Sequence, residues 1–421
     1  RGLIGEAVGC RFDALRPALR IFLCRRGDAL TVWENEAAMG AGAYAWNVTD
    51  GRAVAGRNQT RARIIASNAK LFTSAAALAR FGTGGRFSTA VHTNGTVTAG
   101  TLTGDLYLRG GGDPLFGNSS FVTTNFGSRA TIETLADNLK AQGITRVSGG
   151  VIGDESAFDS RRGTAYSGWG RSGDIGGTLG GLIVNKGFVA GRYQASPPLF
   201  AAQRLAAALQ ASGIKVTTPS TAGRTPAGAR RLTFVRSLPV SALVRQMNKP
   251  SNNYLAEMLV KSLALSPGAA DDDDDGGSVA IGSTPATTRA GYTAAVQFAA
   301  SLGSRLKLLD GSGLSRSDRA APREVVDLLR GIQKTVAFTD FRASLPIAGV
   351  DGTLHSRMTR SIAKNRCQAK TGTLSNVSTL SGYCTTIGGD LVAFSLLQNS
   401  VAPYSAKLQQ DRVAGVIAGL N

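Results

Sequence analysis

Residues 63–82 read R-I-I-A-S-N-A-K-L-F-T-S-A-A-A-L-A-R-F-G, and they contain the string S-N-A-K, which begins at Ser67. The run Lys70–Phe81 is rich in alanine and leucine and is followed by a glycine, a pattern that predicts a helix. Ser67 therefore lies at a helix start. Because residues three apart share one face of a helix, the amine of Lys70 can reach the hydroxyl of Ser67. The string thus predicts a nucleophile with its base.

The position of this pair favours acyl transfer. The unpaired N–H groups and the positive dipole at a helix start stabilise a negative oxygen beside Ser67. Lys70 is a base only when it is neutral, and burial together with a second cation, Lys370, lowers its pKa. Alone, S-x-x-K fits a plain helix N-cap equally well. A second copy at Ser361–Lys364 lies among arginines with no apolar helix after it, so we interpret that copy as a surface turn.

A second string, S-N-N, begins at Ser251, directly after the helix-breaking Pro250. Ser251 and Asn253 are two residues apart on an irregular segment, so both can point into one cleft. We expect Ser251 to pass the proton from the base to the leaving amine, and Asn253 to hold the substrate amide. The alternative is again helix capping, which serine and asparagine favour.

The third string, K-T-G, begins at Lys370 and is predicted to end a strand. Gly372 allows a substrate backbone to approach closely and to pair with the strand edge. We expect Lys370 and Thr371 to bind a substrate carboxylate. The backbone N–H groups of Ser67 and Thr373 are the expected donors to the oxyanion.

Histidine-based catalysis and metal chemistry find little support. The chain has two histidines, His92 and His355, and neither lies near a G-x-S-x-G elbow. A Ser-His-Asp triad is therefore disfavoured. Metal sites usually need histidines or free cysteines, so we expect no metal and no cofactor.

The composition excludes some partners. A formal net charge of +19 over 421 residues raises nucleic acid as a partner. The basic residues are scattered, however, and aromatic residues make up only 6% of the chain, whereas nucleic-acid binders combine a basic stripe with stacking residues. We expect no nucleic acid, and an anionic bacterial envelope explains the charge equally well. No window approaches the roughly 18 continuous apolar residues of a membrane span.

Two of the four cysteines, Cys367 and Cys384, flank the K-T-G string. We predict a hairpin with strands Gln368–Thr373 and Val377–Thr385, which places these cysteines opposite each other. Opposed residues of a non-hydrogen-bonded antiparallel pair have Cα atoms about 4.5 Å apart, at the short end of the range that a disulfide bridges. We therefore predict a disulfide and an oxidising compartment. The alternative is two buried free thiols.

Strand patterns near both ends of the chain predict one α/β unit whose sheet uses both ends. Strands are expected at Ala43–Val48 and Arg52–Ala55, and again from the K-T-G string onward. The catalytic unit then comprises residues 1–84 and 236–421. Residues 85–235 form an insertion that leaves and rejoins this unit.

Two segments are not explained by this division. The first forty residues show no clear pattern, and no geometric argument decides whether Cys10 and Cys24 pair. The acidic run Asp271–Asp275 lacks the ligand spacing of a calcium-binding loop, so we interpret it as a solvated loop.

Together these residues resemble the penicillin-binding proteins of the D-alanyl-D-alanine carboxypeptidase/endopeptidase type, in the low-molecular-mass subgroup with a large insertion between the first two strings. Three further strings carry the resemblance: G-D-L-Y-L-R-G-G-G-D-P at Gly104–Pro114, D-G-S-G-L-S-R at Asp310–Arg316 and D-G-T-L at Asp351–Leu354. The resemblance implies an α/β (α+β) catalytic domain like that of serine β-lactamases, with an antiparallel sheet flanked by helices. It also implies an inserted domain that is mainly β.

The resemblance implies the reaction as well. Ser67 would be acylated by a peptidoglycan stem peptide with Lys70 as base, and water would then release the product. The second and third strings keep the roles given above. β-Lactams would act as inhibitors on the same serine, and the protein would work outside the bacterial cytoplasm, periplasmic or secreted. The segment G-D-E-S-A-F-D at Gly153–Asp159 would reach the cleft from the insertion.

Two rival functions remain, and one departure from the family pattern bears on the site. S-N-N replaces the commoner S-D-N, although the serine and the last asparagine are kept.

A β-lactamase usually needs a separate glutamate, often in an E-x-x-L-N string, and none follows Asn253. A non-catalytic envelope-binding module is disfavoured because both lysines and both serines are retained. Carboxypeptidase and endopeptidase activity fit the sequence equally.

Overall fold

The K-T-G string lies on an edge strand of a five-stranded sheet in the computed structural model, which describes residues 21–22, 31–32, 41–127, 130–265 and 284–421. The sheet is antiparallel throughout, in the order β18-β19-β20-β3-β4. Strands from both ends of the chain therefore share one sheet, as predicted. Its strands are β3 (Ala41–Asn47), β4 (Arg52–Arg57), β18 (Cys367–Leu374), β19 (Val377–Thr385) and β20 (Leu391–Asn399).

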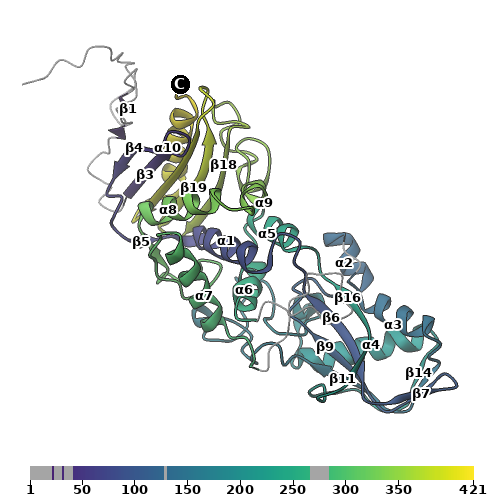
Figure 1. The fold of residues 1–421 in the computed structure, drawn as a ribbon. Helices are drawn as coiled ribbons and strands as arrows, with labels where there is room; N and C mark the ends of the chain where they lie inside the picture. The colour runs from purple at the N-terminus through teal and green to yellow at the C-terminus, as the bar shows by residue number, and fades with distance from the viewer. Residues whose placement is uncertain (1–20, 23–30, 33–40, 128–129, 266–283) are drawn as a thin grey trace, which may run out of the picture.

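Helices cover both faces of this sheet. The helix α10 (Pro403–Ala418) packs on one face and α8 (Pro322–Gln333) on the other, so that β19 and β20 are buried along almost their whole length (Figure 1). An antiparallel sheet flanked by helices is therefore confirmed. The other helices of this lobe are α1 (Ala69–Phe81), α5 (Val240–Asn248), α6 (Asn253–Ser262), α7 (Thr288–Ser301) and α9 (Phe338–Ser344).

The insertion has a second five-stranded sheet, in the order β15-β11-β9-β6-β16. The pairs that involve β6 are antiparallel, whereas β11 pairs parallel with both of its neighbours. Its strands are β6 (Ser88–Thr93), β9 (Leu106–Gly110), β11 (Val151–Asp154), β15 (Thr221–Ala222) and β16 (Arg230–Arg236). A smaller sheet contains β7 (Thr96–Thr98), β8 (Thr101–Thr103), β10 (Arg146–Val147) and β14 (Lys215–Val216).

In its described residues the insertion combines its strands with three helices. Its helices are α2 (Ser119–Phe126), α3 (Ile132–Ala141) and α4 (Pro197–Ala211). The buried residues of α3 recur with helical spacing, which turns one face of that helix toward the insertion's own core. Two prolines in the first turn of α4 suit a helix start, where their missing N–H groups cost nothing.

Separate hydrophobic cores support the proposed division at residues 85–235. One core joins β6, β9, α3 and α4 within the insertion, and a larger one joins α1, α5, α6, α7 and α8. Figure 1 shows the two lobes at opposite ends of the molecule. Six residues of the insertion are buried in the larger core: Phe87, Leu115, Ala157, Phe158, Ile175 and Leu179. The loops around them therefore belong structurally to the catalytic lobe.

Three earlier expectations lie outside the described residues: the pairing of Cys10 with Cys24, most of the first forty residues, and the acidic run Asp271–Asp275. None of the described helices is long and apolar enough to span a membrane.

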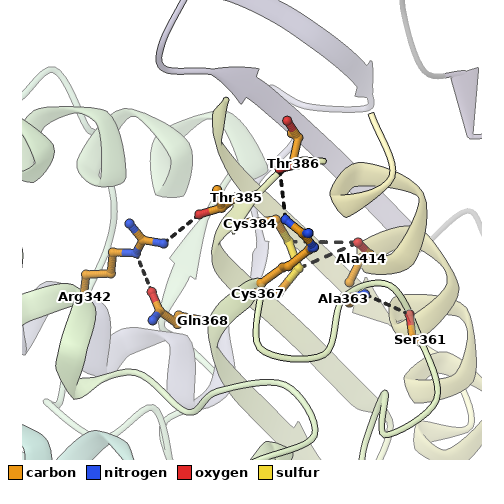
Figure 2. Close-up of a disulfide and its surroundings, with 10 residues drawn as sticks. Arg342, Ser361, Ala363, Cys367, Gln368, Cys384, Thr385, Thr386 and Ala414 are labelled. Atoms are coloured by element: carbon orange, nitrogen blue, oxygen red, sulfur yellow. Dashed lines mark hydrogen bonds between the residues drawn. A yellow bond between two sulfur atoms is a disulfide. The ribbon is translucent and has the colours of Figure 1, made fainter. Parts of the chain in front are cut away.

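The predicted disulfide is confirmed. Cys367 on β18 is the register partner of Cys384 on β19, and a disulfide joins them across a Cα–Cα distance of 4.0 Å. Figure 2 shows that Arg342 ties the same end of the hairpin, with its guanidinium donating to Thr385 Oγ1 at 2.9 Å and to the side chain of Gln368. The strand that carries K-T-G is therefore anchored at its start.

Removal of this disulfide should destabilise the fold. For the Cys367→Ala/Cys384→Ala variant we expect the free energy of unfolding to fall by about 3 kcal/mol, because a loop of this size is no longer closed in the unfolded chain. Denaturant unfolding of the oxidised wild type and the variant measures the difference. Thiol titration of unfolded, unreduced wild type is the control, and four free thiols there would contradict the bond.

Candidate active site

The predicted nucleophile lies in the short 3-10 helix η1 (Ala66–Asn68), which runs directly into α1. Ala66 has a φ of 45°, so the chain turns sharply just before Ser67. Gly313 lies against this turn with a φ of 82°, and a Cβ there would collide with the carbonyl of Ala66. Ser67 itself is partly exposed, so its hydroxyl is accessible at the end of a buried helix.

Two hydrogen bonds fasten this turn to β19. Thr379 Oγ1 donates to the carbonyl oxygen of Ile65 at 3.1 Å. Asn68 Nδ2 donates to Ser381 Oγ at 2.6 Å. The position of Ser67 is therefore set by the strand next to the K-T-G strand as well as by its own helix.

The predicted base, Lys70, is fully buried. Its Nζ atom donates to Ser67 Oγ at 3.0 Å, to Asn253 Oδ1 at 2.7 Å and to the carbonyl oxygen of Ser312 at 2.7 Å. Burial lowers the pKa of Lys70 to about 8. A substantial neutral fraction therefore exists slightly above neutral pH.

The second string lies between α5 and α6, at the predicted break. Ser251 has a φ of 61°, and its Oγ atom accepts a hydrogen bond from Lys370 Nζ at 2.8 Å. The residue that caps α6 is Asn252, whose side chain accepts from Leu255 N. Ser251 and Asn253 are therefore not used as caps, and their side chains face the two lysines.

The third string is in place on β18. Lys370 is fully buried, and its Nζ also donates to the carbonyl oxygen of Thr371 at 2.9 Å. Burial, reinforced by the charge of Lys70, lowers the pKa of Lys370 well below its usual value. The Thr371 hydroxyl shares a 2.7 Å hydrogen bond with Thr353, which belongs to the D-G-T-L string. Thr373 is exposed two residues further along the strand.

Gly372 is required by a close approach of backbones. A Cβ at this position would lie 2.9 Å from the backbone N of Ser67, and it would collide with Thr379 Oγ1. The K-T-G strand can therefore lie against the nucleophile only if residue 372 has no side chain. Gly372 was expected to let a substrate approach the strand, and its lack of a side chain also allows the close approach to Ser67.

The remaining candidates lie elsewhere. His92 is on β6 of the insertion, and His355 follows the short helix η4 (Gly352–Leu354) with its ring beside the carbonyl of Gly352. Ser361–Lys364 forms turns that lead into β18, as interpreted from the sequence. Among the described residues no cluster of histidine, cysteine and carboxylate side chains could hold a metal ion.

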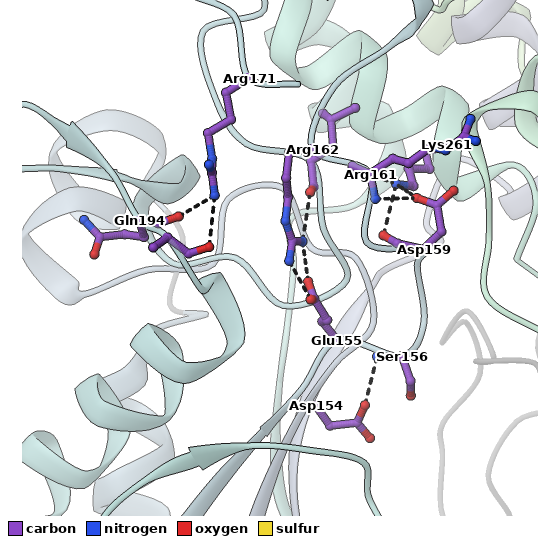
Figure 3. Close-up of polar contacts among 11 residues, drawn as sticks. Asp154, Glu155, Ser156, Asp159, Arg161, Arg162, Arg171, Gln194 and Lys261 are labelled. Carbon is purple, nitrogen blue, oxygen red and sulfur yellow. Dashed lines mark hydrogen bonds and ion pairs between the residues drawn. The ribbon is translucent and has the colours of Figure 1, made fainter. Parts of the chain in front are cut away.

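The structure adds contacts from the insertion that sequence reasoning missed. Asn253 Nδ2 donates to the backbone carbonyl oxygen of Asp174 at 2.8 Å. Asp159, the last residue of the segment expected to reach the cleft, forms a 2.5 Å ion pair with the buried Lys261 of α6 (Figure 3). The sequence carries no signal for the first contact, because it uses a backbone oxygen. The insertion therefore contacts the helix that carries the second string.

The three strings thus define an acyl-transferring serine hydrolase. A family model for the D-Ala-D-Ala carboxypeptidase 3 (S13) family matches residues 32–175 and 184–420. The chain belongs to this family, and its activity class is that of a serine-type D-Ala-D-Ala carboxypeptidase.

Similar proteins agree with this assignment. The D-alanyl-D-alanine carboxypeptidase of Actinomadura sp. (strain R39) is 28% identical over 98% of this chain and 86% of its own length. Carboxypeptidase DacB of Mycolicibacterium smegmatis is 30% identical over 84% of this chain and 74% of its own.

Solved structures show the same fold. The crystal structure of penicillin binding protein 4 (dacB) from Haemophilus influenzae has a TM-score of 0.75 at 22% identity, over 91% of this chain and 98% of that one. A second structure of that protein, complexed with a novel β-lactam, has a TM-score of 0.71 at 21% identity, over 92% and 98% of the two chains.

Substitution of Gly372 should strain the junction between β18 and the nucleophile turn. We expect Gly372→Ala to lower the free energy of unfolding by about 1–3 kcal/mol, because the methyl group must push the strand away from Ser67 and Thr379. Thermal and denaturant unfolding measure the change. Gly84→Ala is the matched control, since a Cβ at Gly84 meets nothing within 4 Å. Equal stability of the two variants would contradict the close approach.

Proposed function

We propose that this enzyme removes the terminal D-alanine from peptidoglycan stem peptides through an acyl-enzyme on Ser67, and that penicillins acylate the same hydroxyl. The Ser67 oxygen attacks the carbonyl carbon, its proton passes to Lys70, and the C–N bond to the leaving D-alanine breaks. Water then hydrolyses the ester. The observation that carries this proposal is the contact of the buried Lys70 Nζ with Ser67 Oγ at 3.0 Å.

The two other contacts of Lys70 orient it as a base. A neutral amine keeps two N–H groups and one lone pair. The carbonyl oxygens of Asn253 and Ser312 accept two N–H groups at 2.7 Å each. Once Lys70 has lost a proton, its lone pair is therefore directed at Ser67 Oγ. A lysine held by only one acceptor could turn this lone pair away.

Ser251 is placed to complete the proton transfer. We assign it the delivery of a proton to the leaving amine, while Lys370 Nζ, 2.8 Å from its oxygen, stabilises the negative charge that the hydroxyl develops. Asn253 reaches toward the substrate amide with Nδ2, after exchanging its hydrogen bond to the insertion.

The end of β18 is the proposed binding strand. The exposed Thr373 supplies a hydroxyl to the substrate carboxylate, and its N–H joins that of Ser67 in binding the oxyanion. Lys370 is fully buried, so its charge acts on the carboxylate through the local field. Thr371, held by Thr353, supports the strand from within.

The β-lactamase alternative lacks a free carboxylate base at this position. Glu257 lies one helical turn after Asn253, but it is fully buried, and its two oxygens accept the N–H groups of Gly311 and Ser312. A glutamate held in this way cannot activate water for rapid deacylation. A long-lived penicilloyl-enzyme follows, which is the behaviour of a penicillin target.

Location outside the bacterial cytoplasm is part of the proposal. The disulfide between Cys367 and Cys384 suits an oxidising compartment, and peptidoglycan lies there. The β-lactam complex of the Haemophilus protein supports β-lactams as ligands of this fold.

Labelling with a fluorescent penicillin tests the nucleophile. We expect the wild type to form a covalent adduct that decays slowly, and Ser67→Ala to form none, because no other hydroxyl contacts Lys70 in the described site. Gel fluorescence and intact mass measure the adduct. Ser361→Ala, in the second S-x-x-K copy, is the control and should label like wild type. Undiminished labelling of Ser67→Ala would overturn the mechanism, and rapid decay would favour the β-lactamase.

The rate of acylation should depend on pH through Lys70. Its pKa is lowered to about 8, and the neutral form is the reactive one, so the rate should rise with pH and reach half of its plateau near 8. An ordinary lysine would place this midpoint near 10.4. Stopped-flow acylation between about pH 5 and 10 measures the profile. A rate that falls as the pH rises from 6 to 8 would contradict the assignment of Lys70 as base.

A further inference from the structure

Three buried carboxyl groups lie beneath Lys70, outside the three strings. Glu257 is on α6, while Asp310 and Asp318 are on the loop that joins α7 to α8. All three side chains are fully buried. Carboxyl groups are rarely buried without a structural or functional reason, because desolvation of the charge is costly.

Two of these groups hold one turn of backbone. Glu257 Oε1 accepts from Ser312 N at 2.8 Å and Oε2 accepts from Gly311 N at 3.1 Å. Asp310 accepts from Gly313 N and Ser315 N, at 2.7 Å in both cases, one with each oxygen. These two side chains together fix four backbone N–H groups of the turn.

The turn presents a single carbonyl to the base. The oxygen of Ser312 lies 2.7 Å from Lys70 Nζ, and the next residue back along the turn, Gly311, accepts from Thr73 Oγ1 on α1 at 2.9 Å. The carboxyl groups therefore act on Lys70 in two ways, through the place of this carbonyl and through their charge.

The third group, Asp318, lies near the second and, among the described residues, accepts with only one of its two oxygens. Asp318 Oδ1 accepts from Leu309 N at 2.7 Å, whereas its buried Oδ2 accepts no N–H or O–H hydrogen bond within the described part of the chain. The hydrogen bond from Leu309 N places Asp318 beside the residue that directly precedes Asp310, and Asp310 raises the pKa of Asp318. Two negative charges repel each other strongly at a buried site, so neighbouring carboxyl groups there favour one shared proton. Asp310 already accepts with both oxygens, so the proton belongs on Asp318 Oδ2.

We propose that Glu257 and Asp310 are positioning residues for the base, holding the Ser312 carbonyl so that the lone pair of Lys70 faces Ser67, and that Asp318 carries a proton shared with Asp310. The Asp310–Asp318 pair then has one negative charge. This inference rests on the proposed function, in which Lys70 is the base.

The charges around Lys70 predict how the site responds. The charges of Glu257 and Asp310 raise the pKa of Lys70 against the larger effect of burial, and Lys370 is the cation that faces it from β18. Burial and Asp310 raise the pKa of Asp318 well above its usual range, in keeping with a protonated group. Loss of the single charge of the pair should therefore lower the pKa of Lys70 further.

Two variants test the shared proton through the pH profile of penicillin acylation. Asp318→Asn replaces a neutral acid by a neutral amide that still donates to Asp310, so we expect the midpoint to stay at the wild-type pH. Asp310→Asn/Asp318→Asn removes the charge, and we expect the midpoint to fall by about one pH unit. Asp137→Asn, on the exposed side of α3, controls for net charge. A midpoint shifted equally by the single and double variants, or by neither, overturns the shared proton.

A third variant tests whether Glu257 positions Lys70 through the Ser312 carbonyl. Glu257→Gln places an amide N–H group against a backbone N–H group, which displaces the Ser312 carbonyl. We expect the plateau rate constant of acylation to fall about tenfold while the dissociation constant for penicillin stays unchanged, since only the reacting step uses the orientation of Lys70. An unchanged plateau rate, or a loss of penicillin affinity alone, overturns the positioning role.

Infrared spectroscopy keeps the inference testable if the double variant does not fold. The wild type at neutral pH should show the C=O stretch of a buried protonated carboxylic acid that Asp318→Asn lacks. Absence of that band in the wild type overturns the shared proton. Failure of the proposed function is seen separately, as wild-type protein that does not react with penicillin or reacts equally after Ser67→Ala.

Discussion

The burial of one amine, Lys70 Nζ, is the constraint on which the catalytic lobe depends. A fully buried lysine is costly unless each N–H group finds an acceptor. The three acceptors come from the start of α1, the start of α6 and the loop before α8. These segments are far apart in the chain, so the hydrogen bonds of one side chain are satisfied only when the whole lobe has assembled. The same assembly that folds the lobe therefore also sets the position of Lys70 beside Ser67.

A second buried lysine makes the site electrostatically asymmetric. Lys370 lies on β18 with Ser251 and its own strand as partners, and each lysine disfavours the charge of the other. Near neutral pH one of the two can lose its proton readily, which is what a base requires. The nearby carboxyl groups oppose this effect at Lys70, because their negative charge raises its pKa against burial.

Local patterns in the sequence predicted the parts of the fold that local chemistry determines. Cysteine spacing located the hairpin of β18 and β19, and alanine and leucine content located α1. The short helices α2 and α9 were not predicted, because tertiary packing stabilises them more than propensity does. The hydrogen bonds from the turn at Gly311 and Ser312 to Glu257 were missed for another reason. Glu257 and these partners are more than fifty residues apart, and no motif links them. The turn itself lies within the D-G-S-G-L-S-R string, which carried only the family resemblance.

One helix connects these features. Asn253, Glu257 and Lys261 follow each other at intervals of four on α6, so they lie along one side of it. Asn253 accepts from the proposed base Lys70, Glu257 accepts from the turn whose carbonyl contacts Lys70, and Lys261 pairs with Asp159 of the insertion. A shift of α6 along its axis would disturb all three contacts together. The insertion, by holding Lys261 and the amide of Asn253, therefore restrains the position of Lys70 through the loops that it packs against the catalytic lobe.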